Sequence, residues 1–191
     1  PGWAETSVDE RVERMRKAIQ KIKDATPEIV TLLSREHGKP LYDAEGEIAV
    51  SLMWMEYACD NAKEVLKDEV IEHDNGRTII ARDPKGVISA ITPWNYPLSL
   101  STIKIAPALL AGNTMVLKPS PFAPLAVSKV VEMIADEFPK GVLNLVNGDS
   151  DIGVELTTNP KVAKIAFTGG TRTASHIMRS AADTIKDMTL E

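Results

Sequence analysis

The stretch GVISAITPWNYPLSL places one amide side chain just after a largely apolar run stops. Residues Val87–Ile91 suit a buried strand, the pattern breaks at Thr92-Pro93, and Asn95 follows between two aromatic residues. A side-chain amide N–H held there can stabilise negative charge that develops on a substrate oxygen. It can equally cap a helix that begins a few residues later. The residues alone leave both roles open.

Other groups that could bind a nucleotide also follow apolar runs. Lys118 closes the run 114–117, and an ammonium group there suits a ribose or a phosphate, although most lysines are simply exposed to solvent. Gly169 and Gly170 precede a helical pattern, where bare backbone N–H groups can receive a pyrophosphate. The plainer alternative for the two glycines is an ordinary turn from strand to helix.

Cysteine and histidine offer little catalytic chemistry in this sequence. Cys59 lies in a helical pattern with no histidine or glycine-rich turn beside it, which favours a buried thiol over a nucleophile. His37, His73 and His176 lack metal-ligand spacing, so no metal site is expected.

From Gly86 onward, apolar runs alternate with helical patterns. The expected strands are 87–91, 114–117, 142–146 and 164–167, with a possible fifth near 188–190, and the expected helices are 98–111, 124–138, 151–157 and 171–182. This alternation indicates an α/β fold with a doubly wound parallel sheet, and ligands bind such sheets beyond the carboxyl ends of the strands. The residues at those ends are Asn95, Lys118, Asn147-Gly148 and Thr168-Gly169-Gly170, with Glu191 at or just before the end of the fifth run.

The chain before Gly86 is helical and then forms one ribbon. Ser7 and Glu10 make a capping-box pattern, Gly38 is expected to end a second helix, and a longer helix is expected from about 42 to 66. In the segment 69–83, alternating residues around Asn75-Gly76 predict a β-hairpin with those two residues in its turn. A two-stranded ribbon is marginal alone, so we expect it to lean on a neighbouring subunit.

Composition narrows the classes of partner. The 191 residues are 43% hydrophobic, which suits one globular domain or one domain with an appendage. A net charge of −5 and a pI near 5.3 argue against a nucleic-acid partner. No apolar run reaches membrane-spanning length, and a single cysteine fits a reducing, cytoplasmic compartment.

Five segments together resemble the aldehyde dehydrogenase superfamily. They are TPWNYP (92–97), LLAGNTMVLKPSPFAP (109–124), GVLNLVNGD (141–149), KIAFTGGT (164–171) and MTLE (188–191). Their order makes the resemblance specific, and it covers essentially the whole chain. No G-x-G-x-x-G pattern follows any strand, so the common dinucleotide fingerprint is absent. The resemblance itself implies a Rossmann-like domain that binds the dinucleotide in a variant manner.

The resemblance implies roles for two catalytic residues. Asn95 would donate its amide N–H to the oxyanion formed during aldehyde oxidation, and Glu191 would be the general base that activates a thiol or a deacylating water. The family's nucleophilic cysteine lies beyond that glutamate in a separate catalytic domain, and Cys59 has no matching motif. The expected function is therefore the N-terminal, cofactor-binding part of an aldehyde dehydrogenase, inactive by itself.

The resemblance further implies NAD as the cofactor, with NADP tolerated rather than excluded. The expected cofactor-binding residues are Thr92, Pro93, Trp94, Lys118, Ser120, Pro121, Gly148, Phe167, Thr168, Gly169 and Gly170. Two positions depart from the common family pattern. Pro121 stands where NAD-selective relatives often carry a glutamate that repels a 2′-phosphate. Ala174 stands where a second glycine is usual. It brings a methyl group into the first turn of the helix whose N-terminus is expected to receive the pyrophosphate.

The expected organisation has three parts. Residues 1–68 form a helical segment packed on the cofactor domain, 69–83 form the hairpin of an oligomerisation arm, and 84–191 form the Rossmann-like domain, cut before the catalytic domain. The expected partners are a small aldehyde and further copies of the chain in a homodimer or homotetramer. A non-catalytic nucleotide-binding or assembly module with the same fold is the alternative. Asn95 and Glu191 argue against it, because a pure nucleotide binder needs neither.

Overall fold

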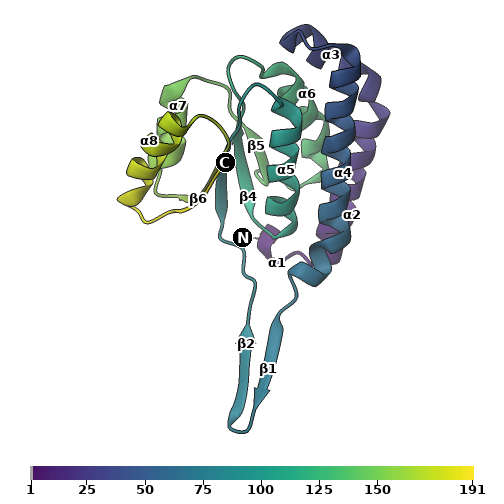
Figure 1. Ribbon diagram of the computed structural model, residues 1–191. Helices are drawn as coiled ribbons and strands as arrows, with labels where there is room; N and C mark the ends of the chain where they lie inside the picture. The colour runs from purple at the N-terminus through teal and green to yellow at the C-terminus, as the bar shows by residue number, and fades with distance from the viewer. Residues whose placement is uncertain (1) are drawn as a thin grey trace.

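The computed structural model describes residues 2–191, which fold into helices, one hairpin and one parallel sheet (Figure 1). The elements before the sheet are α1 (Gly2–Glu5), α2 (Val8–Asp24), α3 (Thr26–His37), α4 (Leu41–Val65), β1 (Glu69–His73) and β2 (Gly76–Ile80). The alternating part comprises β3 (Val87–Ile91), α5 (Pro97–Leu110), β4 (Thr114–Lys118), α6 (Leu125–Ile134), η1 (Ala135–Glu137), β5 (Leu143–Leu145), α7 (Ser150–Thr158), β6 (Val162–Phe167), α8 (Thr171–Ala182) and β7 (Asp187–Leu190).

The five-stranded sheet has the order β5-β4-β3-β6-β7, and every neighbouring pair is parallel. Within the sheet, the chain begins at the central strand β3 and moves outward through α5 to β4 and through α6 to β5. It then returns through α7 to β6, on the other side of β3, and continues through α8 to β7. Figure 1 shows α5 and α6 on the same side of the sheet as the N-terminal helices, with α7 and α8 on the opposite side. The doubly wound Rossmann-like fold expected from the sequence is confirmed, and its switch point lies between β3 and β6.

Two apolar clusters cover the sheet unequally. The larger one joins the N-terminal helices, α5, α6 and one face of the sheet, so these helices share a core with the sheet. The smaller one lies under α8 and consists of Val162, Ile165, Phe167, Ile177 and Ala181. Strand β6 serves both clusters, because Ile165 and Phe167 point to one face and Ala166 to the other. Burial on both faces explains why its sequence is a continuous apolar run.

The start of α2 and the end of α3 follow the expected local chemistry. The side chain of Ser7 accepts a hydrogen bond from the Glu10 N–H at 3.2 Å. The Glu10 carboxylate pairs with Arg14 at 2.9 Å, so it does not complete the expected capping box within the described residues. Gly38 ends α3 with a φ of 78°, a conformation that glycine adopts without steric cost.

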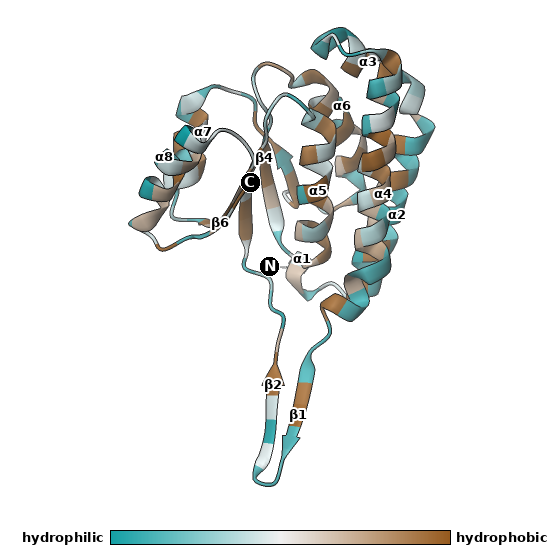
Figure 2. Ribbon diagram, in the orientation of Figure 1, coloured by the Kyte–Doolittle hydropathy of each residue, from teal (hydrophilic) through white to brown (hydrophobic). Residues whose placement is uncertain are grey.

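The hairpin projects away from the rest of the fold (Figure 1). Its turn is Asp74-Asn75, since Gly76 already pairs with His73 as the first residue of β2. The prediction of an Asn75-Gly76 turn is therefore wrong by one position. Only Gly76 there takes a positive φ, 144°, so the glycine is needed just after the turn. Every residue of both strands is exposed, including the apolar Val70, Ile71, Ile79 and Ile80, and Figure 2 shows brown segments in both strands.

Several element boundaries differ from the predicted ones. Strand β4 extends to Lys118 and β5 is shorter than expected. Helix α6 ends at Ile134 and the chain continues as the short 3-10 helix η1, because Phe138 precedes a proline and is extended. None of the helices within residues 2–191 is long and apolar enough to cross a membrane.

Candidate functional site

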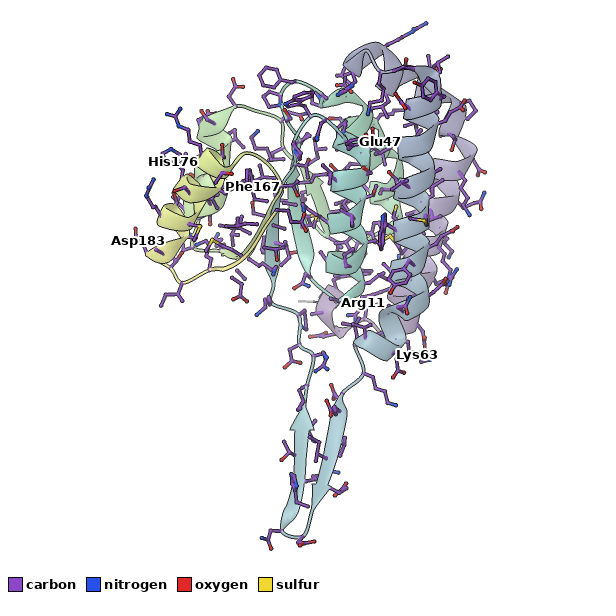
Figure 3. The ribbon with its side chains drawn as sticks, in the orientation of Figure 1. Arg11, Glu47, Lys63, Phe167, His176 and Asp183 are labelled. Atoms are coloured by element: carbon purple, nitrogen blue, oxygen red, sulfur yellow. The ribbon has the colours of Figure 1, made fainter. Side chains whose placement is uncertain are left out.

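A cavity of about 600 Å³ lies where β3, β4 and β6 end, between the strand ends and helices α7 and α8. Every expected cofactor-binding residue except Gly148 lines it: Thr92, Pro93, Trp94, Lys118, Ser120, Pro121, Phe167, Thr168, Gly169 and Gly170. The parallel sheet brings these three separate segments to one edge. His176 of α8, for which the sequence predicted no role, also lines the cavity, and Figure 3 shows it across from Phe167.

Two glycines near this cavity are required by close packing. A Cβ on Gly169 would lie 2.5 Å from Cζ of Phe167, so the turn passes directly against the aromatic ring. A Cβ on Gly148 would lie 2.4 Å from Cγ1 of Ile152, and Gly148 has a φ of 157°. Gly148 thus shapes the entry into α7, and the next residue, Asp149, lines the cavity.

Lys118 brings a buried cation to the cavity. It is the last residue of β4 and only 5% exposed, with Nζ donating to the Pro119 carbonyl at 3.3 Å. Burial lowers the pKa of Lys118, while the nearby Asp149 and Asp151 act in the opposite direction. The register places Ile91 and Lys118 side by side, so the ends of β3 and β4 are level. A donor at this point can reach a ligand that lies across both strand ends.

The N-terminus of α8 opens on the same cavity. Its N-cap residue, Gly170, makes no side-chain cap hydrogen bond, and a Cβ there would meet nothing within 4 Å. Ala174 packs against the smaller apolar cluster and is not among the residues lining the cavity. The methyl group at this departure from the family pattern therefore faces the core. The helix end can receive an anion through its first N–H groups.

A second cavity of about 380 Å³ lies on the face of the sheet covered by α5, and Glu191 and Lys104 line it. Oε2 of Glu191 accepts hydrogen bonds from Lys104 Nζ at 2.9 Å and from Thr168 Oγ1 at 2.8 Å. The bond from Lys104, and then that from Thr168, lowers the pKa of Glu191, because both donors stabilise the ionised carboxylate. Because Thr168 also lines the first cavity, it links the two.

Lys104 was missed in the sequence reading. Its side chain is only 6% exposed, on a helix that is otherwise buried along this face. A lysine within the apolar stripe of a helix is a detectable signal, since lysines are seldom buried without a partner. Its partner is Glu191, 87 positions away in the sequence, which spacing alone could not identify.

Asn95 lies in the turn between β3 and α5 with an exposed side chain. Tyr96 is the N-cap of α5 and makes no side-chain cap bond, and the N–H of Leu98 donates instead to Oε1 of Glu47 at 2.8 Å. This removes the helix-cap alternative for Asn95. Its neighbour Trp94 lines the first cavity, but Asn95 is not among the residues lining either cavity.

Cys59 is a buried core residue, as the sequence indicated. It is 4% exposed within α4, and burial raises the pKa of its thiol to about 11, so the thiol is protonated near neutral pH. Among residues 2–191, no group of three or more histidine, cysteine or acidic side chains could hold a metal ion.

Comparison with known proteins decides the family. The sequence model described as the aldehyde dehydrogenase family matches residues 1–191. The chain belongs to the aldehyde dehydrogenase family. It is 38% identical over 196 residues to glutarate-semialdehyde dehydrogenase of Pseudomonas aeruginosa, a match that covers 100% of this chain and 40% of that relative.

Solved structures agree with this assignment. An E. coli NADP-dependent enzyme superposes with a TM-score of 0.96 at 35% identity, covering 100% of this chain and 40% of that one. Betaine aldehyde dehydrogenase from Staphylococcus aureus, in complex with NAD+, gives a TM-score of 0.95 at 32% identity, covering 99% of this chain and 38% of that one. The aldehyde dehydrogenase resemblance seen in the sequence is confirmed. The chain spans about two fifths of the length of these relatives.

Proposed function

We propose that this chain is the cofactor-binding portion of an NAD(P)-dependent enzyme that oxidises an aldehyde to a carboxylic acid. The observation that carries the proposal is the contact between Thr168 and Glu191. Thr168 lines the first cavity and donates to the carboxylate at 2.8 Å, so an ionised base stands next to the space suited to a dinucleotide. A module that only bound nucleotide would have no use for that carboxylate.

The residues of the first cavity fit a dinucleotide. The open N-terminus of α8 would receive the pyrophosphate, and the ammonium of Lys118 would donate to the adenosine ribose. When bound, the nicotinamide accepts the hydride that leaves the substrate. One related structure is described with NAD+ and another as NADP-dependent, in agreement with use of NAD and tolerance of NADP.

Within the reaction, Asn95 and Glu191 would act on different steps. A cysteine thiolate from another part of the full-length protein adds to the carbonyl carbon, and the carbonyl oxygen gains negative charge. The Asn95 amide N–H stabilises that oxyanion until hydride departs and a thioester forms. Glu191 then takes a proton from the water that attacks the thioester, which releases the acid and the thiolate.

We further propose that 1–68 supports the cofactor domain 84–191 and that the hairpin 69–83 joins subunits of a cytoplasmic homodimer or homotetramer. The hairpin exposes four large apolar side chains, Val70, Ile71, Ile79 and Ile80, on strands that have no core of their own. Light scattering on the full-length protein without residues 69–80 should give a smaller assembly. An unchanged mass would refute this role of the hairpin.

The general-base assignment can be tested with Glu191→Gln in the full-length protein. The variant should still produce NADH or NADPH in its first turnover, while steady-state turnover falls by about 100-fold or more because the thioester is hydrolysed slowly. Stopped-flow absorbance separates the two phases. Cys59→Ser is the matched control and should turn over normally. Steady-state turnover that is unchanged in Glu191→Gln would contradict the proposal.

A further inference from the structure

Helix α5 is capped by a side chain from a different helix. Oε1 of Glu47, on α4, accepts the N–H of Leu98 at 2.8 Å and the N–H of Ser99 at 3.2 Å. These are among the first N–H groups of α5, which have no partner within their own helix. The N-cap residue Tyr96 makes no side-chain cap bond. The carboxylate thus holds the helix that directly follows the Asn95 turn, and Figure 3 shows it near that end of α5.

The other oxygen of this carboxylate is paired with Lys39. Lys39 Nζ contacts Oε2 of Glu47, and the two side chains are 8% and 0% exposed. The same ammonium donates to the Asn95 carbonyl at 3.2 Å and lies 4.8 Å from the centre of the Tyr96 ring. One buried ion pair therefore contacts the Asn95 turn directly and also the helix that follows it.

The corner between α3 and α4 puts Lys39 in this place. Gly38 ends α3 with a left-handed backbone, and Pro40 is the N-cap of α4, so Lys39 lies in a short, tightly bent connection. Glu47 lies in the buried stripe of α4, next to Ile48 and one turn before Ser51. A buried carboxylate persists in such a stripe when both of its oxygens are bonded, as they are here.

The strand side of the turn is also fixed. The N–H of Thr92 donates to the Lys118 carbonyl at 3.1 Å, and its hydroxyl lies 3.1 Å from that of Ser101. The turn is thus anchored before Asn95, at the Asn95 carbonyl and at the start of α5. The Asn95 side chain is left exposed.

We propose that Lys39 and Glu47 are positioning residues that fix the direction of the Asn95 amide, an inference that depends on the oxyanion role proposed above. An oxyanion donor is effective only if it is already in place when the charge forms. A misplacement of about 1 Å can lower a rate by roughly 100-fold. Neither residue lines either cavity, so we expect their effect to pass through Asn95.

A double-mutant cycle in the full-length protein tests the proposal. Glu47→Gln keeps the size of the side chain but loses the charge that holds Lys39. In single turnovers at saturating aldehyde and cofactor, it should lower the rate of NADH formation by about tenfold or more, with the dinucleotide Kd within about twofold of wild type. In an Asn95→Ala background, the same change should lower the rate by less than about twofold, because the group it positions is gone.

Two further variants make the result decisive. Glu56 lies on the same helix as Glu47, α4, and pairs with Lys23 of α2 at the surface. Glu56→Gln removes that pairing and should leave the rate unchanged. Lys39→Arg retains the charge opposite Glu47 but changes the donor to the Asn95 carbonyl, and it should give a partial loss that also disappears without Asn95. If Glu47→Gln does not fold, Lys39→Arg decides the same cycle.

Each outcome has a distinct meaning. Equal losses with and without Asn95 would overturn the positioning role, because the ion pair would then affect the rate independently of Asn95. A normal rate in Asn95→Ala, with a loss in Glu47→Gln, would show that the oxyanion role proposed for Asn95 is wrong, independently of how the ion pair acts.

Discussion

Helices α5, α6 and α8 all follow strands whose ends form the candidate site, yet their N-termini differ. Glu47 accepts the first N–H groups of α5, and Glu36 accepts those of α6 through Leu125 and Ala126. Helix α8 has Gly170 as its N-cap and no side-chain cap bond. N–H groups already bound to a carboxylate cannot receive a phosphate. Of these three helices, α8 alone has an N-terminus without a side-chain cap, which is what a helix end that receives a ligand requires, while α5 and α6 are held by the N-terminal helices.

The two sides of the sheet differ in the same sense. The side with α5 and α6 carries the larger apolar cluster, whereas the α8 side rests on the smaller one. The first side thus supports α5, which follows the Asn95 turn, and the second supports α8, whose residues line the first cavity.

The largest effect on dinucleotide affinity should come from closing the α8 side. Gly169→Ala places a Cβ 2.5 Å from the Phe167 ring, so the ring or the turn must move, and dinucleotide binding should weaken by about tenfold or more. Titration calorimetry on the full-length protein measures the Kd. Gly46→Ala is the control, because a Cβ there meets nothing within 4 Å on an exposed helical face. A Kd unchanged in Gly169→Ala would contradict the role given to this turn.

Cofactor preference should respond to a charge in the loop after β4. Pro121 lines the cavity and offers no carboxylate. Pro121→Glu should penalise NADP by about 1–2 kcal/mol relative to NAD, because a partly solvated carboxylate repels the 2′-phosphate. The measurement is the ratio of kcat/KM for the two cofactors, before and after the substitution. Complete rejection of NADP by the wild-type protein would show that another group sets the selectivity.

Removal of the second distant cap should cost stability. Glu36→Gln weakens the cap on α6, and the free energy of unfolding should fall by about 1 kcal/mol, the usual value of an N-cap. Urea unfolding measures it. Glu45→Gln, at an exposed position on α4, should change the value by no more than about 0.5 kcal/mol. Equal stability of the two variants would mean that Glu36 is not an effective cap.

The smallest effect concerns the titration of Glu191. Its pKa lies below the usual range because Lys104 and Thr168 donate to the carboxylate. A depressed pKa in the folded state contributes stability above the unfolded pKa, and this contribution is lost as the pH falls through the folded pKa. Because the Lys104 bond is the largest cause of the shift, Lys104→Met should raise the pKa of Glu191 toward its ordinary value. Carbon NMR titration measures this pKa. A pKa that stays equally low would assign the shift to Thr168.

Much of this fold could be predicted because local chemistry specifies it. The apolar runs of the parallel strands and the helix-ending Gly38 can be read directly, and α8 was predicted to the residue. The turn of the hairpin was displaced by one position, because Asn-Gly favours the turn itself while the register puts Gly76 in β2.

The site was only partly predictable for a different reason. Strand ends gather at one edge in any parallel sheet, so Lys118 and the Thr168–Gly170 turn could be placed together from sequence. Glu36, Lys39 and Glu47 act across long separations, 51 residues between Glu47 and Leu98, and no local pattern encodes such a contact. A buried charge in an apolar stripe marks Glu47 as unusual, but its partner is known only from the fold.

The most direct test of the account is Asn95→Ala in the full-length protein. Single-turnover NADH formation should slow by about 100-fold, equivalent to roughly 2.7 kcal/mol or more of barrier, because the amide acts on charge that is absent from the ground state. The dinucleotide Kd, measured in parallel, should stay within about twofold of wild type, since Asn95 lines neither cavity. A normal rate of NADH formation with a large loss of dinucleotide affinity would contradict the account, because Asn95 would then serve binding rather than the reaction.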